Sequence, residues 1–168
     1  MRQNKNNIVK GLHAHLNVDV VPTDTASRKP EYPYLSYKII TEQEPARFAI
    51  VYEAVPSTNP NFDTDVKVIR KEQNHFTMSI NAYSMDEDEA RELAIKAAEW
   101  FSFTGYHYFA SINVAVIKVG EVTDRTQQLV DDYERRYGFD VRIRAAKGIS
   151  KRLERIEGYA FNGSTNPE

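Results

Sequence analysis

The carboxylates closest to a catalytic arrangement are Asp124, Asp131, Asp132 and Glu134, which lie together in the segment 121–144. A glycosidase or a nuclease needs two such acids in one pocket with divergent pKa values. Here every acid has arginines within a few residues, which favours ion pairing over catalysis. A carboxylate hydrolase remains one alternative, and it requires Asp124, Asp131 or Asp132 to occupy a deep pocket with a raised pKa.

The histidines and the acidic run 86–89 do not predict a metal site. His13 and His15 are two residues apart, so on a helix they point about 200° apart and cannot ligate one ion together. On a strand they would share a face, but a third ligand would have to come from elsewhere. The acidic run lacks the spaced oxygen ligands and the turn glycine of a calcium loop, and the start of a helix explains it. We therefore expect neither a metal nor a cofactor.

Composition excludes several other classes of function. The chain has no cysteine, which rules out disulfides, thiolate catalysis and zinc–thiolate sites. It contains no GxSxG, no phosphate-binding glycine loop and no HExxH. A net charge of -2 argues against general nucleic-acid binding. We expect no signal peptide and no transmembrane segment, because no stretch is long and apolar enough.

Hydrophobic periodicity predicts two helices. Residues 4–16 repeat an apolar side chain every four positions, with Asn6 or Asn7 as the cap. Residues 85–104 form the longer helix, behind a capping box of Ser84 and Glu87, and Gly105 ends it.

The same patterns predict a series of strands. They are residues 18–21, 34–41, 47–55, 65–72, 75–83 and 110–119. The last is apolar on both faces and is predicted to be a central strand. We expect residues 65–72 and 75–83 to form a hairpin about Gln73 and Asn74, and the polar loops 23–33 and 56–64 to project.

The segment 133–144 alternates between apolar and charged side chains. Tyr137, Phe139, Val141 and Ile143 fall on one side; Arg136, Asp140, Arg142 and Arg144 fall on the other. This period of two predicts a strand with one face in a core and one charged face available to a partner. Four acids and four arginines lie between Asp131 and Arg144, so the charges of this stretch balance and it suits a protein surface better than a polyanion. The basic residues Lys147, Lys151, Arg152 and Arg155 fit either a solvated face or a contact with nucleic acid or an acidic protein.

Strands grouped before one long helix are typical of an α+β fold: a mostly antiparallel β-sheet packed by that long helix and a short N-terminal helix. A chain of 168 residues fits a single domain spanning 1–168, with residues 162–168 as a frayed tail. The segment 148–158 fits either a last strand or a short basic helix.

Two blocks of the chain resemble the neck terminator proteins of tailed bacteriophages, a group of tail terminator (tail-completion) proteins. The first is TDRTQQLVDDYERRYGFDVRIR at residues 123–144, preceded by INVAVIKVG at 112–120. The second is FTMSINAYSMDEDEARELAIKAAEWF at residues 76–101. VDVVP at 18–22 and YPYLSYKI at 32–39 match in layout, so the similarity covers most of the chain.

The resemblance implies a tail-terminator-like structural protein of the virion, assembled in the host bacterial cytoplasm, without catalysis. Such proteins form a ring, typically a hexamer, that caps the tail tube and docks to the connector or adaptor proteins, with DNA only as passing cargo and no membrane contact. The candidate residues for the subunit interface are Asp124, Arg125, Tyr133, Glu134, Arg135, Arg136 and Tyr137. The alternative is a small soluble α+β protein-binding module without a role in the virion.

Overall fold

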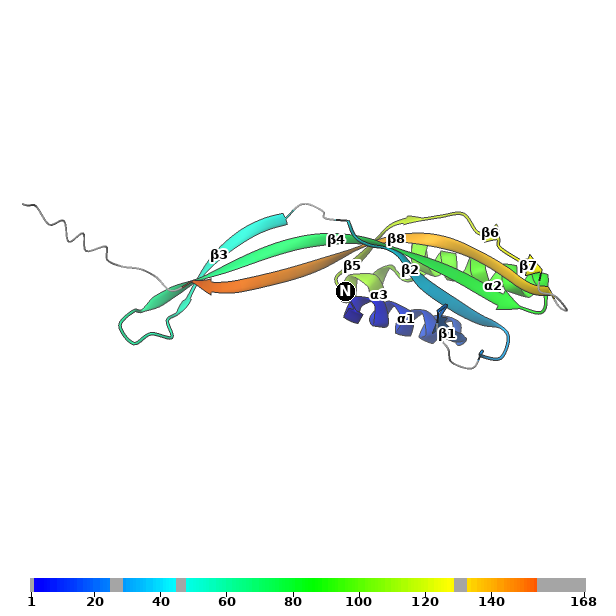
Figure 1. Ribbon diagram of the computed structural model, residues 1–168, viewed down its shortest axis with the longest axis horizontal. Coiled ribbons are helices and arrows are strands. Elements are labelled where there is room, and N and C mark those ends of the chain that lie inside the picture. Colours follow the sequence, from blue (N-terminus) through cyan, green and yellow to red (C-terminus); the bar gives the residue numbers. More distant parts are fainter. Residues whose placement is uncertain (1, 25–28, 45–47, 129–132, 154–168) are drawn as a thin grey trace, which may run out of the picture. The chain divides into compact units, whose positions relative to one another are not determined.

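The computed structural model describes residues 2–24, 29–44, 48–128 and 133–153 (Figure 1). Its contacts divide the chain into two compact units, Met1–Arg47 with Gln73–Lys147 (unit 1) and Phe48–Glu72 with Gly148–Glu168 (unit 2). Two long strands, β4 (Thr64–Ser84) and β8 (Tyr133–Leu153), each contribute to both units. The single-domain organisation stays a prediction.

Unit 1 contains a mostly antiparallel sheet with the strand order β1-β2-β4-β8-β5. Strand β1 (Asp19–Pro22) pairs in parallel with β2 (Tyr34–Glu44), whereas the β2–β4 and β5–β8 pairs are antiparallel. Two short strands, β6 (Thr123–Asp124) and β7 (Gln127–Gln128), also pair antiparallel with β8. The predicted α+β class with a mostly antiparallel sheet is confirmed.

The N-terminal helix is present, but the predicted long helix is not. Helix α1 covers Arg2–Leu16, so Asn6 and Asn7 lie inside it and do not cap it. The predicted helix 85–104 is divided into α2 (Glu87–Glu99) and a π-helical turn, η1 (Trp100–Thr104). A further helix, α3 (Tyr106–Ser111), follows Gly105, where the π-helical turn ends as predicted. All of these helices are short.

The cap of α2 also differs from the predicted box. Asp86 is the N-cap, and its carboxylate accepts a hydrogen bond of 2.8 Å from the backbone N–H of Glu89. Ser84 instead accepts from the N–H of Asp86 and donates to the Glu89 side chain. The acidic run therefore supplies both the cap and the charges that suit the positive end of the helix.

The core lies between the helices and one face of the unit 1 sheet. Ile8 and Leu12 of α1, with Leu93 and Ala97 of α2, are buried with the apolar side chains of the strands. The strand residues at its centre are Phe76, Met78, Ile80 and Ala82 of β4 and Phe139, Val141, Ile143 and Ala145 of β8. Their alternate spacing puts them on the same side, as the sequence pattern predicted.

Two strand predictions are wrong. No hairpin forms at Gln73 and Asn74, because β4 runs through them without a break. Neither residue requires a turn conformation, and there is no glycine beside them to favour one. The predicted central strand 110–119 is shorter, β5 (Val114–Val119), because α3 includes Ala110 and Ser111. It is also not central, because it lies at the end of the sheet path.

Unit 2 consists of strands without a helix in its described residues. Strand β3 (Phe48–Pro56) pairs antiparallel with the first part of β4, from Phe48 opposite Glu72 to Pro56 opposite Thr64. The predicted loop 56–64 is the connection of this hairpin. Residues 148–153 belong to β8, so this part of the segment left open in the sequence is a strand; residues 154–158 lie outside the described part.

A buried carboxylate, Asp65, holds the base of that connection. It accepts hydrogen bonds from the Ser57 hydroxyl (2.8 Å) and the Thr58 N–H (3.3 Å) and forms an ion pair of 3.2 Å with Arg152. The Arg152 guanidinium also donates to the carbonyl of Pro56. Since a buried charge is tolerated only when it is paired, these contacts tie the loop to the end of β8.

The glycines of β8 provide a test of the packing in unit 1. A Cβ on Gly138 would lie 2.6 Å from the carbonyl oxygen of Ile80 and closer still to the side chain of Asn81, whereas at Gly148 nothing lies within 4 Å. We expect Gly138→Ala to lower the free energy of unfolding by about 1–3 kcal/mol, as overpacking does. The fluorescence of Trp100, the single tryptophan and a core residue of unit 1, reports this unfolding. Gly148→Ala is the matched control. An equal loss of unfolding free energy in both variants would contradict the close packing at Gly138.

Candidate protein-binding surface

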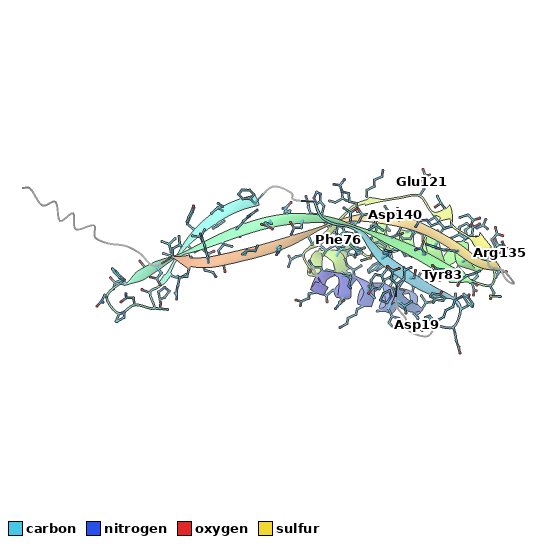
Figure 2. All side chains as sticks on the ribbon, viewed as in Figure 1. Asp19, Phe76, Tyr83, Glu121, Arg135 and Asp140 are labelled. Carbon is cyan, nitrogen blue, oxygen red and sulfur yellow. The ribbon has the colours of Figure 1, made fainter. Side chains whose placement is uncertain are left out.

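Strand β8 has two chemically different sides. Phe139, Val141 and Ile143 are buried under the helices, so the intervening residues Arg136, Gly138 and Asp140 lie on the opposite, open side of the sheet. Arg135 and Tyr137 lie on the helix side, ahead of the core residues. Figure 2 labels Arg135 and Asp140 on this strand and Tyr83 on β4. The predicted interface segment is therefore shared between two surfaces.

On the open side, Arg125 reaches across β8 to β4. Its guanidinium donates to Ser79 Oγ (2.8 Å) and Asn81 Oδ1 (3.1 Å), and it pairs with Asp140 Oδ1 at 3.2 Å. The missing side chain at Gly138 leaves the space in which Asn81 approaches β8. Backbone bonds fix the segment, since the N–H of Arg125 donates to the carbonyl of Arg136 at 2.7 Å. Arg125, which lies between β6 and β7, therefore links strands β4 and β8 of its own chain.

Next to this network, aromatic rings stack across the strands. The rings of Tyr34 on β2 and Tyr83 on β4 lie 4.8 Å apart and almost parallel, at 3°. The guanidinium of Arg136 on β8 lies over the Tyr83 ring, 5.5 Å from its centre. The Nε atom of Arg136 is buried and has no hydrogen-bond partner within the described residues. Stacking on Tyr83 therefore contributes to the position of this side chain.

The carboxylate of Glu134 closes the end of this stack. It accepts hydrogen bonds from the hydroxyls of Tyr32 (2.8 Å) and Tyr34 (3.3 Å) and pairs with Lys29 at 2.5 Å. Burial raises the pKa of Tyr34 well above its ordinary value, and the negative charge of Glu134 raises it further. Burial also raises the pKa of Tyr32. Both phenols therefore stay protonated as donors through the neutral range.

On the helix side, a second polar group surrounds Glu87 at the start of α2. The Glu87 carboxylate accepts from the hydroxyl of Tyr137 (3.0 Å), which raises the pKa of that phenol, and lies 3.8 Å from Arg135. Asp124 is exposed and pairs in register with Tyr137. We call Glu87, Asp124, Arg135 and Tyr137 the Glu87 cluster. It joins β6, β8 and α2 at an accessible edge.

The structure thus divides the seven predicted interface residues. Arg125, Glu134 and Arg136 make contacts within the chain on the open side, and Asp124, Arg135 and Tyr137 belong to the Glu87 cluster. Tyr133 begins β8, and its side chain lies outside the described part. As an interface, the set stays a prediction.

The geometry at Asp124 does not meet the requirement of the carboxylate hydrolase. Hydrogen bonds from the side chain and backbone of Thr126 lower the pKa of Asp124, and the positive charge of Arg135 lowers it further. An exposed carboxylate with a lowered pKa is a poor proton donor near neutral pH. Asp131 and Asp132, the other two acids of that hypothesis, lie outside the described residues.

Neither a metal cluster nor a membrane helix occurs within the described ranges. No group of three or more His, Asp or Glu side chains there is placed to hold a metal ion. The imidazole of His13 is bound to the carbonyl of Val18 (2.6 Å), and the ring of His15 lies beside Trp100. No helix among the described residues is long and apolar enough to cross a membrane.

Sequence reasoning missed the partners that the open side uses. The hydroxyl of Tyr34, the ring of Tyr83 and the side chains of Ser79 and Asn81 come from other strands, and the hydroxyl of Tyr32 comes from the segment before β2. One signal was available, because Ser79, Asn81 and Tyr83 alternate with the apolar core residues of β4. Their pairing with β8 depends on the strand order, which the sequence pattern did not predict.

The comparison with known families gives one match. A family model described as "Phage neck terminator protein" matches residues 6–166, which is nearly the whole chain. No curated protein matches the chain.

Titration of the tyrosines tests the position of Glu134. Because its charge raises the pKa of Tyr34, Glu134→Gln should lower that pKa towards, but not down to, the ordinary value near 10, since burial remains. The raised pKa of the folded state means that the stability linked to Tyr34 is complete below about pH 10 and is lost as the pH rises further. NMR titration of labelled tyrosine rings measures the shift. Glu121→Gln, at an exposed carboxylate of the same unit, is the control and should leave Tyr34 unchanged.

Proposed function

Because the chain belongs to the phage neck terminator family, we propose that it is a subunit of a ring that caps the tail tube and docks it to the connector. Its role is that of a structural protein of the phage neck. A homohexamer is the expected ring, with the tail tube and the connector or adaptor proteins as its partners. The protein then acts in the virion.

The observation that carries this proposal is the extent of the family match. It spans residues 6–166 and therefore includes both units and every strand that the structure describes. The polar side chains of the chain form links across strands. This geometry is compatible with a structural role. Of the predicted acidic group, Asp124 is exposed with a lowered pKa, and Glu134 accepts hydrogen bonds from two tyrosines.

Among the predicted interface residues, those of the Glu87 cluster (Asp124, Arg135 and Tyr137) support the ring contact best. Arg125 and Glu134 already form hydrogen bonds and ion pairs inside the subunit, and Arg136 stacks on Tyr83. The exposed carboxylates of Glu87 and Asp124, with Arg135 between strand and helix, put opposite charges at one edge. A ring subunit needs two different faces that complement each other, and a mixed-charge edge suits one of them.

The net charge of the whole chain supports the proposal that DNA passes through the ring as cargo. A lumen lined with cations would bind phosphate in proportion to the contacts made. The net charge of -2 keeps the average field weakly repulsive to DNA. We therefore propose that DNA passes through the ring without being held by it.

Charge reversal at Arg135 tests the proposed ring contact. Arg135→Glu places a like charge next to Glu87 and, in a ring, against the acceptor of the neighbouring subunit; such juxtapositions cost several kcal/mol at an interface. We expect completed tails to fall by about tenfold or more, the factor that each 1.4 kcal/mol contributes. Complementation of a phage that lacks its own copy, with tails counted by electron microscopy, measures this.

The control for that experiment is Lys10→Glu, which reverses an exposed charge on α1 of the same unit. Circular dichroism of both purified variants establishes that they are folded. Normal tail completion by folded Arg135→Glu would show that the Glu87 cluster is not the ring contact. An equal loss of completed tails with both variants would show that the total charge of the chain, rather than the Glu87 cluster, determines tail completion.

A further inference from the structure

The guanidinium of Arg136 has no acceptor within the described residues. Its side chain is half-buried and lies over the ring of Tyr83, and its Nε atom is buried without a hydrogen-bond partner there. An N–H group without an acceptor costs free energy, and the planar fork of an arginine matches a carboxylate. Arg136 is therefore suited to bind a carboxylate that another chain supplies.

Arg136 begins a row of cations on the open side of unit 1. Arg142 and Arg144 follow it by alternation along β8, and Lys118 of β5 lies opposite Arg142 in the register. Arg142 contacts His75 of β4, at 3.5 Å. Lys118 and Arg144 form no ion pair among the residues that the structure describes. We call Lys118, Arg136, Arg142 and Arg144 the basic stripe.

The described acids of the open side do not neutralise the basic stripe. Glu134 and Asp140 share its side of β8, but they already pair with Lys29 and Arg125. The exposed Glu121, in the connection after β5, offsets one cation at most. The acid of β1 lies at the opposite end of the sheet path. The stripe therefore keeps a net positive charge.

The exposed side of α2 carries the opposite charge. The helix and its cap, residues 86–99, contain six acidic and two basic side chains, all of them exposed. The two basic residues pair with Asp88 and Glu92. Of the other four acids, Glu87 contacts Arg135, and three have no ion pair in the described part: Asp86, Glu89 and Glu99. We call this surface the acidic helix face. Because α2 packs on the core, this face and the basic stripe lie on opposite sides of the sheet.

We propose that the acidic helix face of one copy of this chain binds the basic stripe of the next copy. The inference rests on the proposed ring, and it extends the ring contact from the Glu87 cluster along α2. A ring requires two different and complementary surfaces on every subunit, and the two sides of unit 1 supply them. Their lengths are similar, because thirteen helical steps span about 20 Å and eight strand steps span about 27 Å.

The direction of α2 assigns the ends of this contact. Within one subunit α2 begins at Glu87, beside Arg135, and therefore at the Arg136 end of the basic stripe. A ring whose axis runs along β8 repeats this direction from copy to copy. The first turn of α2 then supplies the carboxylate for Arg136, and Glu99 at the other end of the helix lies near Arg144.

DNA is the competing ligand for a basic surface. Glu134 and Asp140 lie beside the cations of the stripe, so a row of phosphates would meet these carboxylates as well. The acidic helix face contains its own cations, Arg91 and Lys96, and such a mixed surface can match a mixed stripe. The pattern of charges therefore favours a protein surface over a polyanion.

Charge reversal in separate copies tests the contact. The stripe variant carries Lys118→Glu and Arg144→Glu, and the helix variant carries Glu92→Lys and Glu99→Lys. Each variant alone places like charges in every contact, and we expect its self-association to weaken at least about 30-fold, the scale of an interface hot spot. An equimolar mixture should form rings again with equal numbers of both variants, because the reversed stripe meets the reversed helix. Native mass spectrometry identifies such rings.

The same pattern should appear in tail completion, with a loss for each variant alone and recovery when both are co-expressed. The matched control carries Lys10→Glu and Lys71→Glu, two exposed positions outside both surfaces that change the net charge as much as the stripe variant does. It should assemble like the wild type. Circular dichroism establishes that all variants are folded.

Three outcomes would overturn the proposal. Normal assembly by either folded variant alone, or a mixture that fails where the wild type assembles, would reject this contact and leave the proposed ring intact. Loss of binding to a labelled DNA duplex in the stripe variant, with unchanged self-association, would assign the stripe to DNA. A wild-type chain that neither forms a ring nor completes tails would contradict the proposed function as well.

Discussion

Strand β8 must bury Phe139, Val141 and Ile143 beneath the helices, and most of the other features of unit 1 follow from this constraint. A strand with a period of two has no freedom to place the intervening residues elsewhere. Gly138 and Asp140 therefore face the open side, where Arg125 spans the strand and binds Ser79 and Asn81 of β4. Shifting β8 by one residue would bury the arginines and expose the core.

The two units differ in how far their apolar surface is covered. In unit 1 the helices cover one side of the sheet, and polar bonds and stacked tyrosines cover part of the other. Among its described residues, unit 2 pairs the buried Asp65 with the exposed Arg152, while Phe48, Ile50 and Tyr52 of β3 are exposed. An ion pair of this kind fixes geometry more than it adds stability.

Local pattern was sufficient for some elements and insufficient for others. The apolar repeats at Ile8 and Leu12, and at Phe139 and Val141, identified a helix and a strand with the correct buried sides. Gln73 and Asn74 were wrongly predicted as a turn because two polar residues between apolar runs are as compatible with a continuous strand. The π-helical turn at Trp100 depends on the packing of Trp100 and Phe101 against Phe109, which no local signal contains.

For the binding surface, the sequence identified the segment but not its contacts. Balanced charges between Asp131 and Arg144 predicted an outer surface. The strand order then assigned Arg125, Glu134 and Arg136 to contacts within the chain, which depend on residues far away in sequence. The sequence also did not predict that Phe48, Ile50 and Tyr52 are exposed, because their alternation is what a strand with a covered side would show. Only the structure shows that these three side chains are exposed.

The central claim is that copies of this chain form a ring at the neck of a phage, and imaging that neck tests it most directly. Cryo-electron microscopy of tails completed with a tagged copy measures where the chain lies and with what symmetry. The account predicts a closed ring of identical copies at the end of the tail tube that faces the head. A neck that lacks the chain, or holds it as a single copy, would contradict the account.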